Sequence, residues 1–342
     1  MLNGLQCGRA VAALMVAVFH ANVFLLPKNF YNGEGAGVGF NFGYAGVEFF
    51  FVLSGFIMAL VHRRDFGQPA QATRFLRKRI LRIYPIYWVV LTALLAIYFA
   101  APGRGPEHAR EGFAILTSYL LFPTIDGPIM QIAWTLQHEM LFYAVFTLLI
   151  VHIRWGMVAF GGWMLACVIS LPFWPEMAYP FEFVLKAHNL LFLFGILAAL
   201  VYKHLSQNMA RLSFWAGTLL FLGIGLTETM GGMALSENIR PLGYGLGAAL
   251  AVIGLAQGNL PAPNWLTFLG NASYAIYLVH LPVMNIAAVP LRKLEVHTMI
   301  PPLAMLALIT VIVTIAGSLA HIYLEKPLIA FFAKRAAKKS AA

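Results

Sequence analysis

Charged residues are scarce in this sequence. Asp, Glu, Lys and Arg together make up 11% of its 342 residues, whereas 61% are hydrophobic. Soluble domains carry about 25% charged residues, so the composition excludes an ordinary soluble protein. Apolar runs of about 18–22 residues recur along the chain, the length that a helix needs to cross a bilayer. Because only helices and closed barrels satisfy their backbone inside lipid, these runs predict an all-α, polytopic transmembrane helical bundle.

Cysteine and acidic residues are also few. The two cysteines, Cys7 and Cys167, are far apart and neither stands in a metal-ligand spacing, so we expect neither a disulfide scaffold nor a metal site. Lys and Arg number 23 against 13 acids, a net charge of +10. In a membrane protein the usual source of such an excess is the cytoplasmic loops. We therefore expect membrane lipids, and no nucleic acid, to face these cations.

The apolar runs divide the chain into about ten predicted spans. An even number places both termini on the same side, and most Lys and Arg then fall in loops on that side, which predicts cytoplasmic termini. We expect one transmembrane domain over residues 1–335 and a basic cytoplasmic tail over 336–342. The predicted spans cover residues 8–27, 43–62, 80–101, 133–152, 156–173, 187–202, 213–230, 240–257, 268–288 and 302–324.

The first span contains two ionisable residues, Arg9 and, eleven positions later, His20. At about 100° per residue, eleven steps end about 20° beyond three full turns, so both residues lie on one helix face. The rise of 1.5 Å per residue separates them by about 16 Å, which places His20 near the middle of the bilayer. An ionisable group at that depth indicates a functional site. The alternative is a hydrogen bond from His20 to a neighbouring helix.

The second span carries the acid Glu48 within an apolar run, followed by Ser54 and Gly55. An isolated carboxylate is costly there, so Glu48 is a candidate partner of His20. The small pair Ser54–Gly55 is typical of close helix packing, which we favour over a direct chemical role.

A basic segment precedes the third span: its cations are Arg74, Arg77, Lys78, Arg79 and Arg82. Arg74 and Arg77 are one turn apart on the same helix side, and two guanidinium groups so placed suit the oxygens of a phosphorylated ligand. The alternative is a patch that attracts anionic lipid headgroups.

Two later spans carry polar stripes. Glu139 and Tyr143 share a face in the fourth span, near Trp134, whereas His138 lies on another face and has no predicted role. In the ninth span Ser273, Tyr277 and His280 form a stripe that indicates either a pocket wall or interhelical hydrogen bonds. Glu325 ends the last span, and we expect it to form an ion pair with Arg9 or with the basic segment.

In order along residues 9–327, these motifs are RAVAALMVAVFH, GVEFFFVLSGF, RFLR before RIYPIYW, WTLQHEMLFY, SYAIYLVH and EKP. Together they resemble the acyltransferase 3 family of bacterial integral-membrane O-acyltransferases. The N-terminal sequence is most similar to that of members that acetylate exopolysaccharides. The resemblance implies that Arg9 and His20 are catalytic and that Arg74 and Arg77 bind acyl-CoA at the cytoplasmic face.

The resemblance predicts an O-acetyltransferase of the bacterial inner membrane, with acetyl-CoA as donor and a lipid-linked oligosaccharide or polysaccharide as acceptor. His20 acts as general base, with Glu48 or Glu139 holding the imidazole or the sugar. We group Arg79 and Arg82 with the acetyl-CoA site, and Trp134, Tyr143, Tyr277 and His280 with the acceptor. Direct transfer and an acyl-His intermediate both remain open. The alternative function is a transporter or flippase for a lipid-linked sugar or acyl group, which uses the same buried Arg, His and Glu as a path.

Overall fold

The structure is a computed structural model that describes residues 2–101, 103–174, 176–232 and 235–339. The described residues form helices, turns and loops, which confirms the all-α prediction. Within these described ranges, nine helical segments are long and apolar enough to cross a membrane. They match nine of the predicted spans, so the chain is a multi-pass membrane protein. The side of the membrane on which the termini lie stays a prediction.

The remaining predicted span, 240–257, coincides with helix α11 (Arg240–Gln257). It is a complete helix, but it is not among the nine candidate spans in the described part of the chain. Its first turn contains Arg240 and Pro241, and several positions along its length are glycine rather than a larger apolar residue. Much of α11 is buried and it packs along α10, so it is an inner helix whose surroundings are protein.

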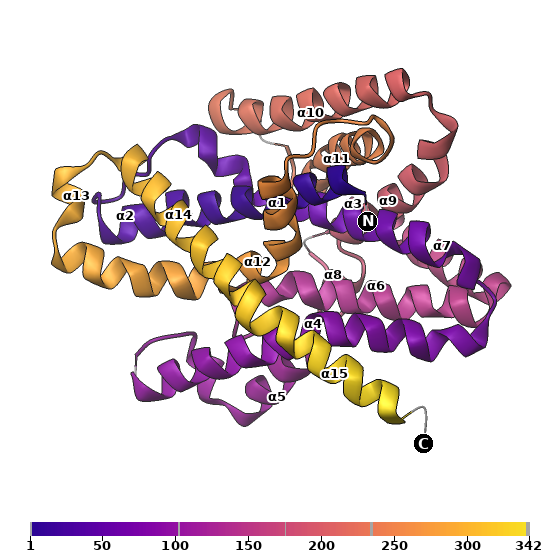
Figure 1. Cartoon of the computed structure of the whole chain (residues 1–342), viewed down its shortest axis with the longest axis horizontal. Helices are drawn as coiled ribbons and strands as arrows, with labels where there is room; N and C mark the ends of the chain where they lie inside the picture. Colours follow the sequence, from indigo (N-terminus) through magenta and orange to yellow (C-terminus); the bar gives the residue numbers. More distant parts are fainter. Residues whose placement is uncertain (1, 102, 175, 233–234, 340–342) are drawn as a thin grey trace. The chain divides into compact units, whose positions relative to one another are not determined.

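The chain forms two compact units. Unit 1 contains residues 1–60 and 191–322. Its longest helices pair as α1 with α12, α12 with α14, and α10 with α11 (Figure 1). Its helices are α1 (Asn3–His20), α2 (Leu26–Asn29), α3 (Gly46–His62), α9 (Leu190–Val201), α10 (Gln207–Met230), α11, α12 (Asn264–Lys293), α13 (Val296–Met299) and α14 (Pro302–Ala320), with the π-helical turn η1 (Ala21–Leu25) and the 3₁₀ segments η2 (Val38–Ala45) and η7 (Tyr202–His204).

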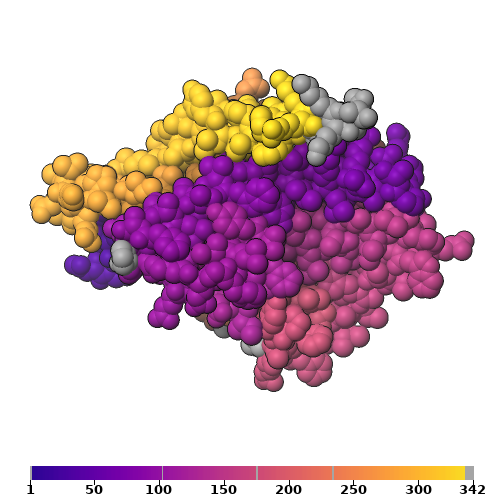
Figure 2. All heavy atoms as spheres, turned by 90° about the horizontal axis from the view of Figure 1, so that it is seen from below, coloured from indigo at the N-terminus to yellow at the C-terminus, as the bar shows by residue number. Residues whose placement is uncertain are grey.

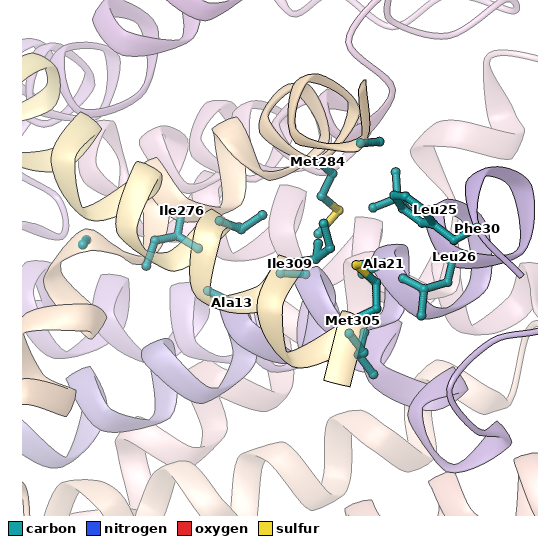
Figure 3. Close-up of a cluster of buried hydrophobic side chains, with 14 residues drawn as sticks. Ala13, Ala21, Leu25, Leu26, Phe30, Ile276, Met284, Met305 and Ile309 are labelled. Carbon is teal, nitrogen blue, oxygen red and sulfur yellow. The ribbon is translucent and has the colours of Figure 1, made fainter. Parts of the chain in front are cut away.

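The core of unit 1 follows from helical periodicity. Ala13, Ala17 and Ala21 recur every four residues on one face of the first helix, and all are buried. Side chains this small let a second helix approach closely. Against them pack larger residues of α12 and α14, among them Ile276 and Ile309 (Figure 3). This core therefore holds the C-terminal end of α1, where His20 lies, beside the middle of α12.

A second close approach joins α3 to α9. A Cβ atom on Gly55 would lie 2.8 Å from the carbonyl carbon of Phe192, and one on Gly195 would lie 2.6 Å from the backbone nitrogen of Phe56. Real Cβ atoms do not come this close to backbone atoms, so both positions need glycine. The prediction that Gly55 serves helix packing is confirmed.

Unit 2 contains residues 61–190 and 323–342. Its helix α15 packs along α4 (Figure 2, yellow against purple). The predicted tail 336–342 begins inside α15, and residues 340–342 lie outside the described residues. The elements of unit 2 are η3 (Arg63–Asp65), α4 (Pro69–Ala100), η4 (Glu107–Arg110), α5 (Gly112–Leu120), η5 (Gln131–Ala133), α6 (Trp134–Val151), α7 (Ile153–Ser170), α8 (Phe181–Val184), η6 (Ala187–Asn189) and α15 (Lys326–Lys339), with the π-helical turn η8 (His321–Glu325) at the border with unit 1.

Candidate active site

His20 and His280 contact each other in unit 1. His20 is the last residue of α1, and its Nδ1 lies 3.3 Å from Nε2 of His280 in α12. The two ring centroids are 4.9 Å apart. His280 is completely buried, whereas His20 is partly exposed. The pair therefore consists of a buried imidazole behind one that a substrate can reach.

Helical spacing explains why these two rings meet. His280 continues the four-residue repeat of α12 that contains the buried residues Ala272, Ile276 and Met284. That row faces α1, so the side chain at position 280 is directed at α1 as well. His20 follows Ala17 of the alanine stripe by three residues, which places it beside the same interface. The close packing of α1 on α12 thus brings the imidazoles together.

The hydrogen bonds of the pair determine where its protons lie. His20 Nδ1 is 2.9 Å from the carbonyl oxygen of Val16, and His280 Nδ1 is 2.5 Å from that of Tyr277. A carbonyl only accepts, so each neutral ring carries its proton on Nδ1 and its lone pair on Nε2. The lone pair of His280 then faces the Nδ1–H of His20. This leaves Nε2 of His20 as the basic nitrogen of the site.

Aromatic rings surround His20. The ring of Phe24 stacks on it with centroids 5.8 Å apart, and that of Phe19 meets it edge-on at 5.1 Å. Phe24 belongs to η1, a five-residue π-helical turn that begins directly after His20. Such turns are rare and frequent at functional sites. Tyr277 packs between the ring of Phe50 and that of His280, so it borders the pair, and its role in a pocket wall stays a prediction.

The other two predicted catalytic residues of unit 1 have distinct surroundings. Arg9 is half-buried in α1, on the helical face that leads to His20. Glu48 is buried in the first turn of α3 and interacts electrostatically with Arg240 and Tyr244 of α11. The sequence pattern predicted His20 as its partner, because nothing in the spacing pointed to α11.

The basic segment of α4, in unit 2, divides into two pairs of arginines. Arg74 and Arg77 are exposed, and neither takes part in an ion pair among the described residues. In contrast, Arg82 forms an ion pair with the completely buried Glu325, which confirms that Glu325 pairs with the basic segment. Arg79 approaches Nε2 of His62 at 3.3 Å, and His62 in turn binds Asp65. Of the four arginines in this described segment, Arg74 and Arg77 are therefore the two that are exposed and unpaired.

The predicted pair on α6 is also formed. Tyr143 donates a hydrogen bond to Glu139, and the guanidinium carbon of Arg79 lies 5.9 Å from the centre of the Tyr143 ring. Trp134 lies edge-on to His138 and His188, and the ammonium of Lys186 is 5.0 Å from its ring centre.

His138 is completely buried, and its Nδ1 lies 2.9 Å from Oδ1 of Asn189. These contacts give it a structural partner, in line with the absence of a predicted role. Among the described residues, no group of three or more His, Cys, Asp or Glu is placed to hold a metal ion.

The sequence matches the acyltransferase-domain family over residues 2–322. This chain belongs to the acyltransferase 3 family. The match covers nearly the whole chain, which confirms the resemblance and the assignment as an enzyme, a membrane acyltransferase. No solved structure matches the chain.

The relatives of this acyltransferase include the following three proteins. Exopolysaccharide production protein ExoZ of Rhizobium meliloti (strain 1021) is 30% identical over 88% of this chain and 94% of its own length. Acyltransferase MdmB of Streptomyces mycarofaciens is 26% identical, over 71% and 68%. Putative peptidoglycan O-acetyltransferase YrhL of Bacillus subtilis (strain 168) is 25% identical, over 96% and 55%. The family thus includes relatives named for exopolysaccharide production and for acyl or acetyl transfer.

Sequence analysis missed two features of this acyltransferase. The contact of His280 with His20 joins positions 260 residues apart, and the polar stripe of α12 identified the residue without its partner. The second is Glu228 near the end of α10, which receives hydrogen bonds from two tyrosines. Its only signal was an acidic side chain inside a predicted span, the same signal that identified Glu48.

Proposed function

We propose that this acyltransferase moves an acetyl group from cytoplasmic acetyl-CoA to a hydroxyl of a lipid-linked cell-surface polysaccharide in the bacterial inner membrane, with His20 as general base. The observation that carries the proposal is the His20–His280 pair. A base is useful when its lone pair is directed at the substrate and its other nitrogen is held in place. The Nδ1 contacts to Val16 and His280 meet that condition and leave Nε2 for the acceptor.

During the transfer, His20 takes up one proton and later releases it. Its Nε2 removes the proton from the acceptor hydroxyl as that oxygen attacks the thioester carbonyl. The tetrahedral intermediate collapses by cleavage of the carbon–sulfur bond, and the imidazolium returns the proton to the coenzyme A thiolate. While His20 is charged, its Nδ1–H is shared by the Val16 carbonyl and Nε2 of His280, and both accept from a cation more strongly than from a neutral ring. Arg9 steadies the CoA moiety or the developing oxyanion.

The donor is bound through Arg74 and Arg77. They are exposed and one turn apart, and two guanidinium groups match the 3′-phosphate and pyrophosphate of acetyl-CoA. Arg79 and Arg82 are engaged by His62 and Glu325, so in this proposal they support α4 beside the donor site. The sequence also predicts acceptor contacts for Trp134 and for Glu139, which Tyr143 holds, and these stay predictions.

The experiment is transfer by the purified protein in lipid nanodiscs. It uses acetyl-CoA labelled in the acetyl group and a lipid-linked oligosaccharide fraction from the producing cell. Label in the lipid fraction and release of the free thiol are followed together. We expect His20→Ala to lower the turnover by about 10²–10⁴-fold, the usual contribution of a general base.

The matched control is His204→Ala, which removes an exposed histidine that follows α9. This variant should turn over like the wild type. Wild-type turnover by His20→Ala, in protein that unfolds at the wild-type temperature, contradicts the catalytic assignment. Labelled acetyl that stays on the protein after rapid denaturation at neutral pH, and is lost in His20→Ala, identifies the acyl-His route.

A further inference from the structure

A second polar cluster lies in unit 1, centred on Glu228 of α10. Tyr44 of η2 donates to this carboxylate, with its hydroxyl 2.8 and 2.6 Å from the two oxygens. Tyr244 of α11 donates to Oε2 at 2.7 Å. Arg240 of α11 pairs with Oε1 at 3.2 Å and lies over the ring of Tyr44, 4.9 Å from its centre. We call these four residues the Glu228 cluster.

The cluster keeps unused hydrogen-bonding capacity. A carboxylate has about four lone-pair positions. Three donors occupy it: the single hydroxyl protons of Tyr44 and Tyr244, and one N–H of Arg240. In the described part of the chain, Nε of Arg240 is buried and has no hydrogen-bond partner. A guanidinium group has five N–H donors, so the cluster offers donors and an acceptor position side by side.

An aromatic wall links the cluster to His20. The ring of Tyr44 meets that of Phe19 edge-on at 5.5 Å, and Phe19 meets the ring of His20 at 5.1 Å. The neighbouring Gly43 permits this contact, because a Cβ there would lie 3.0 Å from Cβ of Phe19. Tyr44, Glu228 and Arg240 are each partly exposed. A ligand at the cluster therefore lies one aromatic ring away from the base.

The charges of the cluster indicate the class of ligand. Glu228 neutralises Arg240, and the buried Glu48 also interacts electrostatically with Arg240. An anionic group would meet two carboxylates beside one guanidinium, which opposes its binding. A neutral ligand whose hydroxyls both donate and accept fits the alternating donors and acceptors. The partly exposed rings of Phe19 and Tyr44 suit the C–H face of such a ring.

We propose that the Glu228 cluster binds the sugar of the acyl acceptor through its neutral hydroxyls, and so presents one of them to His20. This inference rests on the proposed function, because it takes the acceptor to be a carbohydrate. In this inference Glu228 and Arg240 form hydrogen bonds with the sugar hydroxyls. Tyr44 also contacts a hydroxyl, and its ring lines the side of the site that leads to His20. Tyr244, which is completely buried, holds the carboxylate in position.

The test measures binding without turnover, by equilibrium dialysis of the full-length protein in nanodiscs with no acetyl-CoA present. Four probes share one aromatic ring and differ in the group that the ring carries. They are p-nitrophenyl β-D-glucopyranoside and its galactose epimer, p-nitrophenyl phosphate as an anion, and p-nitrophenol as the ring alone. We expect saturable binding of at least one glycoside and weaker binding of the other two probes.

The variants are Glu228→Gln, which removes the charge, and Tyr44→Phe, which removes one hydroxyl. Each should weaken glycoside binding by about ten-fold or more, the usual effect of a lost charge-assisted hydrogen bond. The matched control is Glu237→Gln, because Glu237 is an exposed acid in the loop between α10 and α11. It should bind like the wild type. His20→Ala should also keep glycoside binding.

Four outcomes overturn the inference. Stronger binding of p-nitrophenyl phosphate means an anion site, and equal binding of p-nitrophenol means a plain aromatic pocket. If glycoside binding is unchanged in both variants, or if the wild type binds no glycoside, the cluster does not recognise the acceptor. Glycoside binding that depends on Glu228 in a protein that transfers no acetyl group would uphold this inference and contradict the proposed function.

Discussion

The contact between His20 and His280 predicts how a substitution of His280 changes catalysis. His280→Met keeps the length and much of the volume of the side chain but removes the acceptor that faces His20 Nδ1 at 3.3 Å. A hydrogen bond to a charged group contributes about 1.5–3 kcal/mol, and this one strengthens when His20 becomes an imidazolium. The loss therefore belongs to the transition state, so we expect kcat to fall by about ten- to a hundred-fold.

Two further readouts separate this role from plain packing. His280→Gln places an amide oxygen where Nε2 was, and should restore most of the kcat lost in His280→Met. KM for acetyl-CoA should stay at the wild-type value in both variants, because the His20–His280 contact does not take part in binding acetyl-CoA in the ground state. His138→Met is the control, since His138 is equally buried and bonded to Asn189.

The assay is steady-state release of the coenzyme A thiol in nanodiscs, with the thermal midpoint of each variant measured in parallel. Equal loss of kcat in the Met and Gln variants would assign the effect to volume. Wild-type kcat in His280→Met would refute the reasoning altogether.

Two more predictions concern the donor site and the core. Arg74→Ala combined with Arg77→Ala should raise the Kd for acetyl-CoA by about ten-fold or more, because each guanidinium supplies charge-assisted bonds to phosphate, as titration calorimetry will detect. Gly55→Ala should lower the free energy of unfolding by about 1–3 kcal/mol, because its Cβ meets the backbone of Phe192, and a lower thermal midpoint in detergent measures this.

Matched substitutions control both experiments. Arg63→Ala with Arg64→Ala removes two exposed cations from η3, which precedes α4, and should leave the Kd unchanged. Equal weakening would mean that Arg74 and Arg77 form a patch that attracts lipid headgroups. Gly161→Ala lies in helix α7 with nothing within 4 Å of the new Cβ. It should be neutral or slightly stabilising, and a midpoint for Gly55→Ala as high as that of Gly161→Ala would contradict the close packing.

Much of the fold could be predicted because it depends on local properties of the chain. Each span is an apolar run of bilayer length, and the helices begin and end near where those runs do. The exception, 240–257, is instructive. Its residues form the helix α11 as predicted, yet glycines and Arg240 make it less apolar than a lipid-facing span needs, since its surroundings are other helices.

The candidate site could be predicted residue by residue and not as a set of contacts. Periodicity identified Tyr277 and His280 as one inward stripe, but two helices that share no sequence neighbourhood can meet in many ways. The arginines that the sequence predicts to bind acetyl-CoA divide into two pairs for the same reason. Composition made Arg77 and Arg82 equivalent, and only the fold placed Arg82 against the buried Glu325.

The sequence by itself determined the fold class, the acyltransferase family and the placement of Arg9 and His20 on one helix face, because these depend on residue types at fixed spacing. Tertiary structure alone decided that His280 lies behind His20 and that Glu228 collects Tyr44 and Tyr244. The physical reason is the distance along the chain over which each feature is set. Spacing fixes the direction of a side chain from its own helix, whereas its partner depends on how small residues such as Ala17 let another helix approach.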